Sequence, residues 1–257
     1  MAQVRQLAAI MFADIVGYTA LMEEDEAQAL RLRQKLQQKL ETEVHLHFGK
    51  ILDFRGDGAL CTFSSSIEGI RAALALQVEM QQAPSVPLRI GIHVGDVVAE
   101  GKTIYGDGVN IASRLESLAM PGSIFFSGKV YDDIKNQKDL KSVLLGQYIL
   151  KNVKEPLEVY ALSNAGIITP ESHFLEGKGQ KVRSKCILVL PFVNLSNDPE
   201  QDYFSDGLTE EIISSLARLK GMKIISRTTS MQYKGIKKDI KTIGKEIGAG
   251  YIMEGSV

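Results

Sequence analysis

The first half of the chain alternates strand-like and helix-like segments in an order that few folds accommodate. An apolar run at about residues 7–13 predicts a strand that ends at Asp14, and leucines at helical spacing predict a helix at about 25–48. Two short strands then fold about a Gly-Asp-Gly turn at 56–58, a second helix follows near 66–82, and another strand comes next. This order predicts an α+β fold with a ferredoxin-like βαββαβ core and additions, in which the two helices cover one face of the sheet.

A weakly patterned, polar stretch divides the chain into two predicted domains. The first domain is residues 1–162, and the stretch at 163–185, which is interrupted by Pro170, is predicted to be a linker. Residues 186–257 alternate strand, helix and strand, which predicts a partial α/β domain with a parallel sheet. No nucleophile, general base or phosphate-binding loop stands out in its sequence, so we interpret it as a binding or interaction module. The chain stops at Val257 on the last predicted strand, whose edge would need a neighbouring segment to cover it.

The near-zero net charge of the chain argues against partners that bind a strongly charged protein surface. Thirty basic and thirty-one acidic side chains give a formal net charge of -1, which disfavours nucleic acid and an anionic membrane as partners. No apolar run reaches the ~20 residues that cross a bilayer, and the N-terminus lacks a separate apolar signal region. Cys61 and Cys186 lie far apart and show no metal-ligand spacing, so we expect buried thiols in a reducing compartment. Together these features predict a cytoplasmic protein.

The predicted topology would bring two acidic residues close together. Asp14 ends the first strand, and Asp57 occupies the hairpin turn, which lies beside Asp14 if the first strand pairs with the hairpin. Paired carboxylates bind hard divalent cations such as Mg²⁺, and a two-metal site stabilises both oxygens of an in-line phosphoryl displacement. The alternative for each residue alone is structural: Asp14 would cap a helix N-terminus, and Asp57 would be an ordinary turn residue.

Four motifs, in this order along the chain, carry a resemblance to a known family. They are FADIVGYTALM, RGDGALCTF, RIGIHVGDVV and IYGDGVNIASRLE. Over about residues 7–162 the chain resembles the catalytic domain of class III adenylate and guanylate cyclases. The resemblance implies a homodimer with two active sites at its interface, each built from both chains. It also implies conversion of ATP or GTP to the 3′,5′-cyclic monophosphate and pyrophosphate, with two Mg²⁺ or Mn²⁺ ions at each site.

The resemblance assigns roles to residues at matching motif positions. Asp14 and Asp57 match the two metal-binding aspartates, with the Ile15 carbonyl as a further ligand. Asn110 and Arg114 match a transition-state pair that the partner protomer contributes, in which Asn orients the ribose and Arg offsets charge on the α-phosphate. Their spacing of four residues on a helix puts both on one face. Taken alone, the asparagine would be explained by a helix-start hydrogen bond and the arginine by a surface ion pair with a neighbouring acid.

The resemblance also implies a phosphate-binding segment. Backbone N–H groups that open a short helix after Asp14 would hold the β- and γ-phosphates. A lysine near the final strand of the first domain would add a cation, and two lysines fit this position equally, each with a solvated surface side chain as the alternative. The candidates are Val16, Gly17, Tyr18 and Thr19 for the backbone, and Lys151 or Lys154 for the cation.

Base recognition departs from the adenylate-specific pattern at two positions. Adenylate-specific members usually have Lys three residues before the glycine of the Gly-Asp turn and Asp three residues before the glycine of the GDGVN loop, where this chain has Asp53 and Thr103. Asp53 would accept hydrogen bonds from guanine N1–H and the 2-amino group while Thr103 donates to O6, which favours GTP over ATP. Asp96 stands where many members have a phosphate-binding arginine. These departures support a second hypothesis, a catalytically weak cyclase-like domain that binds nucleotide or dimerises to present the second domain.

The second predicted domain has a resemblance of its own. The run from LPFVNLSNDPEQDYFSDGLTEEI through ISR to EIGAGYIMEGSV resembles the TolB-like N-terminal or FlgO-type module that often follows a bacterial cyclase domain. The resemblance implies a binding role, for which the sequence names neither a ligand nor a partner.

Overall fold

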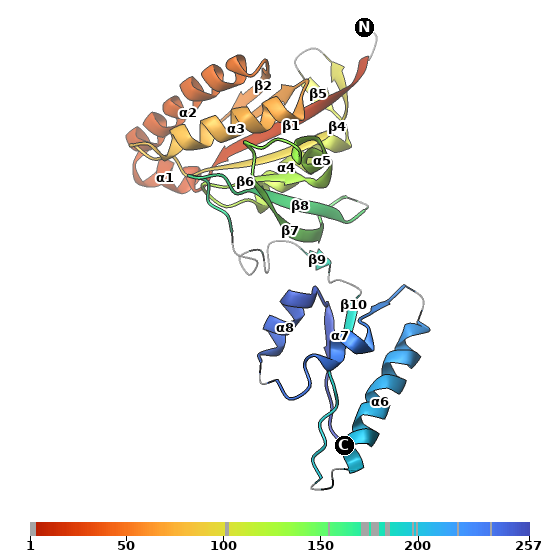
Figure 1. Ribbon diagram of the computed structural model, residues 1–257. Coiled ribbons are helices and arrows are strands. Elements are labelled where there is room, and N and C mark those ends of the chain that lie inside the picture. Colours follow the sequence, from red (N-terminus) through yellow and green to blue (C-terminus); the bar gives the residue numbers. More distant parts are fainter. Residues whose placement is uncertain are drawn as a thin grey trace. The chain divides into compact units, whose positions relative to one another are not determined.

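The chain folds into two compact units, Met1–Val182 and Arg183–Val257 (Figure 1). The computed structural model describes residues 4–100, 103–153, 155–170, 175, 180–182, 186–196, 198, 200–219, 221–236 and 238–257. Among these residues no helix is both long enough and apolar enough to cross a bilayer. Cys61 and Cys186 are free, buried thiols, as the sequence predicts, and burial raises the pKa of Cys61 to about 12.

The strand β1 lies inside the large sheet of the first unit. It pairs antiparallel with β3 on one side and with β4 on the other, and β2 pairs with β3 in a hairpin. The order β2-β3-β1-β4 is that of a ferredoxin-like core, which confirms the α+β prediction. The strands β6, β8, β7 and β9 extend the sheet beyond β4, and β5 pairs with the carboxyl end of β4. The bounds are β1 (Val4–Ile15), β2 (Lys50–Arg55), β3 (Gly58–Phe63), β4 (Leu88–Glu100), β5 (Thr103–Tyr105), β6 (Ile124–Ser127), β7 (Ser142–Ile149), β8 (Leu157–Leu162) and β9 (Gln180–Val182).

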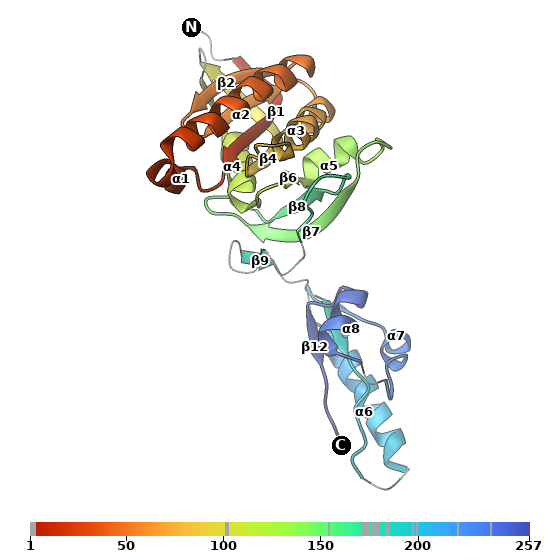
Figure 2. The same ribbon diagram turned by 90° about the vertical axis from the view of Figure 1, so that its left-hand side faces the viewer.

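Helices cover both faces of this sheet (Figures 1 and 2). The two helices of the predicted core, α2 and α3, pack side by side on one face, and α4 packs on the other. Alternate residues of β1 separate the two layers: Ala9 and Met11 pack with α2 and α3, whereas Ala8 and Ile10 pack with α4. The helices of this unit are α1 (Tyr18–Glu24), α2 (Glu26–Leu46), α3 (Ser66–Gln81), α4 (Asp107–Leu118) and α5 (Gly128–Ile134).

Glycines on β4 let α4 approach the sheet at backbone distance. A Cβ added at Gly91 would lie 2.0 Å from the backbone nitrogen of Glu116, so only glycine fits there. Near the other end of the helix, a Cβ at Gly95 would lie 3.3 Å from the Cα of Gly108. This close packing fixes the position of α4, and so of its side chains, relative to the sheet.

The segment predicted to be a linker contributes to the first unit. Its residues 180–182 form β9, which pairs antiparallel with β7, and Ile167 and Leu175 are buried. The compact unit therefore extends beyond residue 162, the predicted end of the first domain, and ends at Val182. Because the segment is polar on average, its composition did not reveal the few apolar side chains that are buried in the first unit.

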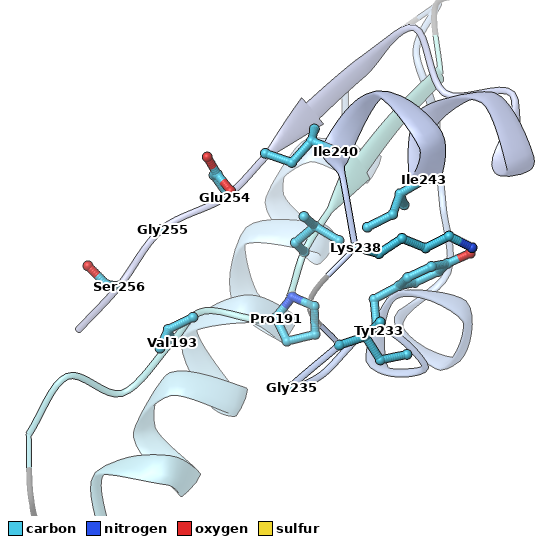
Figure 3. A pocket seen from close by; sticks show the side chains of 12 residues that line it. Pro191, Val193, Tyr233, Gly235, Lys238, Ile240, Ile243, Glu254, Gly255 and Ser256 are labelled. Atoms are coloured by element: carbon cyan, nitrogen blue, oxygen red, sulfur yellow. The ribbon is translucent and has the colours of Figure 1, made fainter.

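The second unit contains a short parallel sheet in the order β11-β10-β12. Its strands are β10 (Cys186–Val189), β11 (Lys223–Ile224) and β12 (Tyr251–Met253), and its helices are α6 (Glu200–Ala217), α7 (Arg227–Met231) and α8 (Ile240–Ile247). Beyond the carboxyl ends of β10 and β12 lies a cavity of about 560 Å³ (Figure 3). Its lining is mostly apolar and includes Leu190, Pro191, Ile240 and Ile243, together with the polar side chains of Tyr233 and Lys238.

Candidate active site

The end of β1 and the β2–β3 turn meet at one cavity. Asp14 is the last residue of the β1–β3 ladder, and the Ile15 N–H donates to the Asp57 carbonyl oxygen at 3.2 Å. Arg33 of α2 supports the turn, because its Nε donates to the Gly56 carbonyl oxygen at 2.6 Å. Asp14 and Asp57 both line a cavity of about 260 Å³, which we call the acid cavity. The strand register therefore brings together the two acids that the sequence places at the ends of these elements.

A helix cap does not explain Asp14. The N-cap of α1 is Gly17, which has a φ of 77°, and no side chain caps this helix. Burial raises the pKa of Asp14 and the nearby Asp57 adds to the rise, against the lowering effect of a hydrogen-bonded arginine, Arg89. A carboxyl group held part-buried beside a second one is the arrangement expected of a functional site rather than of a cap.

A third acid, Asp53, lines the same cavity. The β2–β3 register shifts between Ile51 and Asp53, and such bulges re-aim side chains beside functional sites. Phe12 and Leu60 are among the apolar residues that form the walls. Asp14 and Asp53 thus lie on strands of one sheet and Asp57 on the tight turn that joins two of its strands, and strands hold such side chains more rigidly than long loops would.

Two further charged residues belong to this site, and the sequence analysis did not single them out. Arg89 lies opposite Asp14 in the β1–β4 ladder, and its Nη2 and Nε donate to Asp14 Oδ2 at 2.6 and 3.0 Å. Glu116 of α4 also lines the cavity, and its Oε1 lies 2.5 Å from Arg89 Nε. Burial raises the pKa of Glu116 to about 7 despite the opposing effect of Arg89. The sequence holds one signal for this pair, an arginine inside the otherwise apolar strand LRIGI.

Asn110 and Arg114 lie on α4 but do not line the acid cavity. The helix buries Ala112 and Leu115, while Asn110 is exposed and Arg114 is half-buried. Within the described part of the chain, neither side chain forms a hydrogen bond or an ion pair. Of the two acids that the sequence offers as partners of Arg114, Glu116 contacts Arg89 instead, and Asp107 forms no described ion pair with Arg114. The structural explanations for these residues, a helix-start hydrogen bond for Asn110 and a surface ion pair for Arg114, therefore do not apply in this structure.

The segment after Asp14 forms the turn and short helix that the sequence predicts, with one correction. The Val16 N–H already donates to the Pro87 carbonyl oxygen at 2.9 Å, so it is not available to a phosphate. The N–H groups of Gly17, Tyr18 and Thr19 have no acceptor among the described residues, as is usual for the first turn of a helix. The phosphate-binding candidates of the backbone are thus these three residues.

The remaining candidate site residues either do not line the acid cavity or have no described side chain. Lys151 is exposed in the turn between β7 and β8 and does not line the cavity. Lys154 lies outside the described residues. Thr103 begins β5, opposite Glu100, and its side chain is not among those described.

The acid cavity suits a hard divalent cation. Asp14 and Asp57 offer carboxylate oxygens, and the Ile15 carbonyl is adjacent in the chain. The described residues include no cluster of three or more His, Cys, Asp or Glu side chains arranged to hold a metal ion. Mg²⁺ usually keeps several waters and binds through one or two carboxylates plus substrate phosphates, so a two-carboxylate site fits its chemistry.

A second polar cavity, of about 430 Å³, lies beside the start of α4. Asp96 and Lys129 line it, together with His93, which is only 2% exposed. Burial, helped by Lys129, lowers the pKa of His93 to about 4, and its Nδ1 lies 2.8 Å from Ser127 Oγ. His93 is therefore a neutral, hydrogen-bonded strand residue, in agreement with the simplest interpretation of its sequence position.

The sequence matches a family model described as the adenylate and guanylate cyclase catalytic domain over residues 1–164. Putative adenylate cyclase 3 of Rhizobium meliloti is 37% identical over 262 residues, which cover 98% of this chain and 45% of that protein. An adenylate cyclase of Glutamicibacter nicotianae is 30% identical over 166 residues, which cover 62% of this chain and 41% of that protein. The chain thus spans less than half the length of these two relatives.

Solved structures give the same result. The adenylate/guanylate cyclase/hydrolase from Silicibacter pomeroyi is 34% identical with a TM-score of 0.58, over 63% of this chain and 99% of that chain. The adenylyl cyclase CyaB from P. aeruginosa is 26% identical, also with a TM-score of 0.58, over 64% of this chain and 97% of that chain. On these matches and on the site geometry, the chain belongs to the family of adenylate and guanylate cyclase catalytic domains.

Proposed function

We propose that this chain is a nucleotide cyclase that converts a purine nucleoside triphosphate to the 3′,5′-cyclic monophosphate and pyrophosphate. The ribose 3′-hydroxyl attacks the α-phosphate and loses its proton, the bond from the α-phosphorus to the bridging oxygen breaks, and pyrophosphate leaves. The observation that carries this proposal is the placement of Asp14 and Asp57 at one cavity in a member of the cyclase family.

In this proposal Asp14, Asp57 and the Ile15 carbonyl hold the divalent cations. Two Mg²⁺ or Mn²⁺ ions, when bound, stabilise the charge on the attacking and leaving oxygens. The N–H groups of Gly17 and its two successors orient the polyphosphate at the start of α1. One of two lysines, Lys151 or Lys154, adds a cation to the phosphates. Because the ladder and the turn fix both acids, their carboxylates need little reorganisation when the cations bind.

We propose that each active site is completed by a second copy of the chain. Asn110 and Arg114 do not line the cavity that holds the acids of their own protomer and have no partner among the described residues, which suits a role across an interface. Asn110 orients the ribose, and Arg114 offsets charge that develops on the α-phosphate. The resulting homodimer has two active sites.

For the base, we propose GTP as the preferred substrate. Asp53 supplies acceptors for guanine N1–H and the 2-amino group, and Thr103 supplies a hydroxyl for O6. ATP is the competing substrate, because the curated relatives at 37% and 30% identity are called adenylate cyclases. A shifted base pose in which Asp53 accepts from the adenine amino group would serve ATP.

Product analysis tests the proposal and its alternative. Purified protein is incubated with ATP or GTP and Mn²⁺, and the products are identified by mass. The proposal requires a cyclic monophosphate and pyrophosphate in equal amounts. Bound nucleotide without any cyclic product would support the alternative of a catalytically weak nucleotide-binding or dimerisation module. The exposed Asp96, at the position where the family resemblance implies a phosphate-binding arginine in many members, favours that alternative by adding negative charge.

We propose that the second unit is a binding module whose ligand occupies the cavity shown in Figure 3. The position beyond the carboxyl ends of parallel strands and the mostly apolar lining are both typical of small-molecule sites. Ile240 lines the cavity and is 37% exposed, whereas Leu219 is 50% exposed and does not line it. The fluorescent probe anilinonaphthalene sulfonate, which has apolar aromatic rings and one sulfonate group, should lose binding in Ile240→Glu and keep it in Leu219→Glu. Equal binding to both variants would contradict this role.

A further inference from the structure

Arg89 forms an ion pair with Asp14, one of the two acids proposed to hold the divalent cations. Its Nη2 and Nε both donate to one oxygen, Oδ2 of Asp14, at 2.6 and 3.0 Å. Its remaining nitrogen, Nη1, makes a long 3.5 Å bond to the Ser117 carbonyl oxygen. The guanidinium therefore neutralises the acid that the proposed function assigns to the metal, and a divalent cation must compete with it.

Glu116 provides a second place for the same guanidinium. Its Oε1 lies 2.5 Å from Arg89 Nε, but the Nε–H is donated to Asp14, and Oε1 accepts no hydrogen bond from any residue that the structure describes. Its Oε2 has only a 3.5 Å contact with Ser117 Oγ, and the residue is 7% exposed. A buried acceptor without a donor is unfavourable. If Arg89 and Glu116 had a purely structural role, we would expect the guanidinium to donate a hydrogen bond to this oxygen.

A small rotation of the guanidinium would satisfy Glu116 at the expense of Asp14. Nε is already within contact distance of Glu116, so the transfer turns the Nε–H to Glu116 and releases the Nη2–H from Asp14. A divalent cation at Asp14 would repel the guanidinium and take over its role at the carboxylate, which shifts the balance toward Glu116.

We propose that Arg89 is exchanged for the metal ion: it neutralises Asp14 in the cation-free protein and transfers to Glu116 when a divalent cation binds Asp14 and Asp57. This inference rests on the proposed metal assignment. Glu116 acts as a positioning residue, because it lowers the cost of displacing Arg89 from Asp14. It also lies on α4, the helix that carries Asn110 and Arg114, so cation binding changes a contact of that helix.

A double-mutant cycle on the nucleotide-free protein tests the exchange. Mn²⁺ affinity is measured by calorimetry for the wild type, Glu116→Gln, Arg89→Met and the double variant. Glu116→Gln should weaken Mn²⁺ binding about tenfold, because a neutral amide holds the displaced guanidinium poorly. Arg89→Met should bind Mn²⁺ at least as tightly as the wild type, since it has no competitor to displace.

A matched control separates exchange from the simple loss of a negative charge. Asp53→Asn also removes one carboxylate from the same cavity, and its effect on Mn²⁺ affinity should be equal with and without Arg89. The effect of Glu116→Gln should shrink to that of Asp53→Asn in the Arg89→Met background. Equal losses from Glu116→Gln in both backgrounds, no loss at all, or loss of Mn²⁺ binding in a folded Arg89→Met protein would each overturn the exchange.

Two further measurements complete the test. Asp57→Asn reports the site itself: Mn²⁺ binding that depends on Asp57, combined with a failed cycle, overturns the exchange and leaves the metal assignment standing. Mn²⁺ binding that does not depend on Asp57 overturns both. Titration with diamagnetic Mg²⁺ should also shift the Arg89 Nε–H resonance, which is identified by its absence in Arg89→Lys, and an unmoved resonance at saturation would contradict the transfer.

Discussion

Replacing Gly91 with alanine should push α4 off the sheet. The new Cβ would lie 2.0 Å from the Glu116 nitrogen and 2.6 Å from the Ala112 carbonyl oxygen, whereas ordinary contact begins at 3.4 Å. Both atoms belong to the backbone of α4, so no side-chain rotation relieves the clash and the helix must retreat by roughly 1 Å or more. We expect a loss of about 3 kcal/mol in the free energy of unfolding, near the upper end for overpacking.

The same displacement should reduce catalysis beyond the loss of stability. Asn110 and Arg114 move with α4, and a misplacement of about 1 Å in substrate-positioning groups lowers the rate on the order of 100-fold. Urea unfolding gives the stability, and turnover is measured at a temperature at which the variant is fully folded.

The matched control for this variant is Gly207→Ala. Gly207 lies in α6, and a Cβ there meets nothing within 4 Å, so the variant should be more stable by about 0.5–1 kcal/mol. A Gly91→Ala protein with the unfolding midpoint and turnover of the wild type would refute the backbone-contact argument.

Three other predictions concern the site and its surroundings. Asp14→Asn and Asp57→Asn should each abolish cyclase turnover with nearly unchanged thermal melting, because each removes a cation ligand and no core side chain; near wild-type turnover in either would remove the metal assignment. Asp53→Lys combined with Thr103→Asp should shift the preference from GTP toward ATP by about tenfold or more in catalytic efficiency, and a competition assay in which the wild type prefers ATP would contradict the base assignment. His93 has a folded-state pKa of about 4 against 6.5 unfolded, so the unfolded state binds the extra proton and stability should fall by about 3 kcal/mol as the pH drops from 6.5 to 4. Unfolding curves of His93→Gln should lack this component, and an equal decline in both proteins would contradict it.

The meeting of Asp14 and Asp57 could be predicted because it depends on short-range order. A strand, a helix and a hairpin in sequence leave few ways to pair, and the acids stand at the strand end and the turn. The periodicity of the leucines in α2 likewise sets its buried face, which includes Leu32, Leu36 and Leu40.

The contact between Arg89 and Glu116 could not be predicted in the same way. Arg89 meets Asp14 through the β1–β4 register, which joins residues 75 positions apart, and Glu116 arrives only because Gly91 lets α4 approach the sheet. The pairing of β9 with β7 could not be predicted for a related reason, because the average composition of residues 163–185 gives no sign of a strand there.

The claim that each active site is built from two chains is tested most directly by mixing two inactive variants. Asp57→Ala lacks a cation ligand, and Asn110→Ala lacks the amide proposed to orient the ribose. In a heterodimer of the two, one of the two interfacial sites retains both intact groups, so mixing should restore part of the wild-type activity. Absence of any recovery, in a sample where exchange into heterodimers is demonstrated by native mass spectrometry, would contradict the two-chain site.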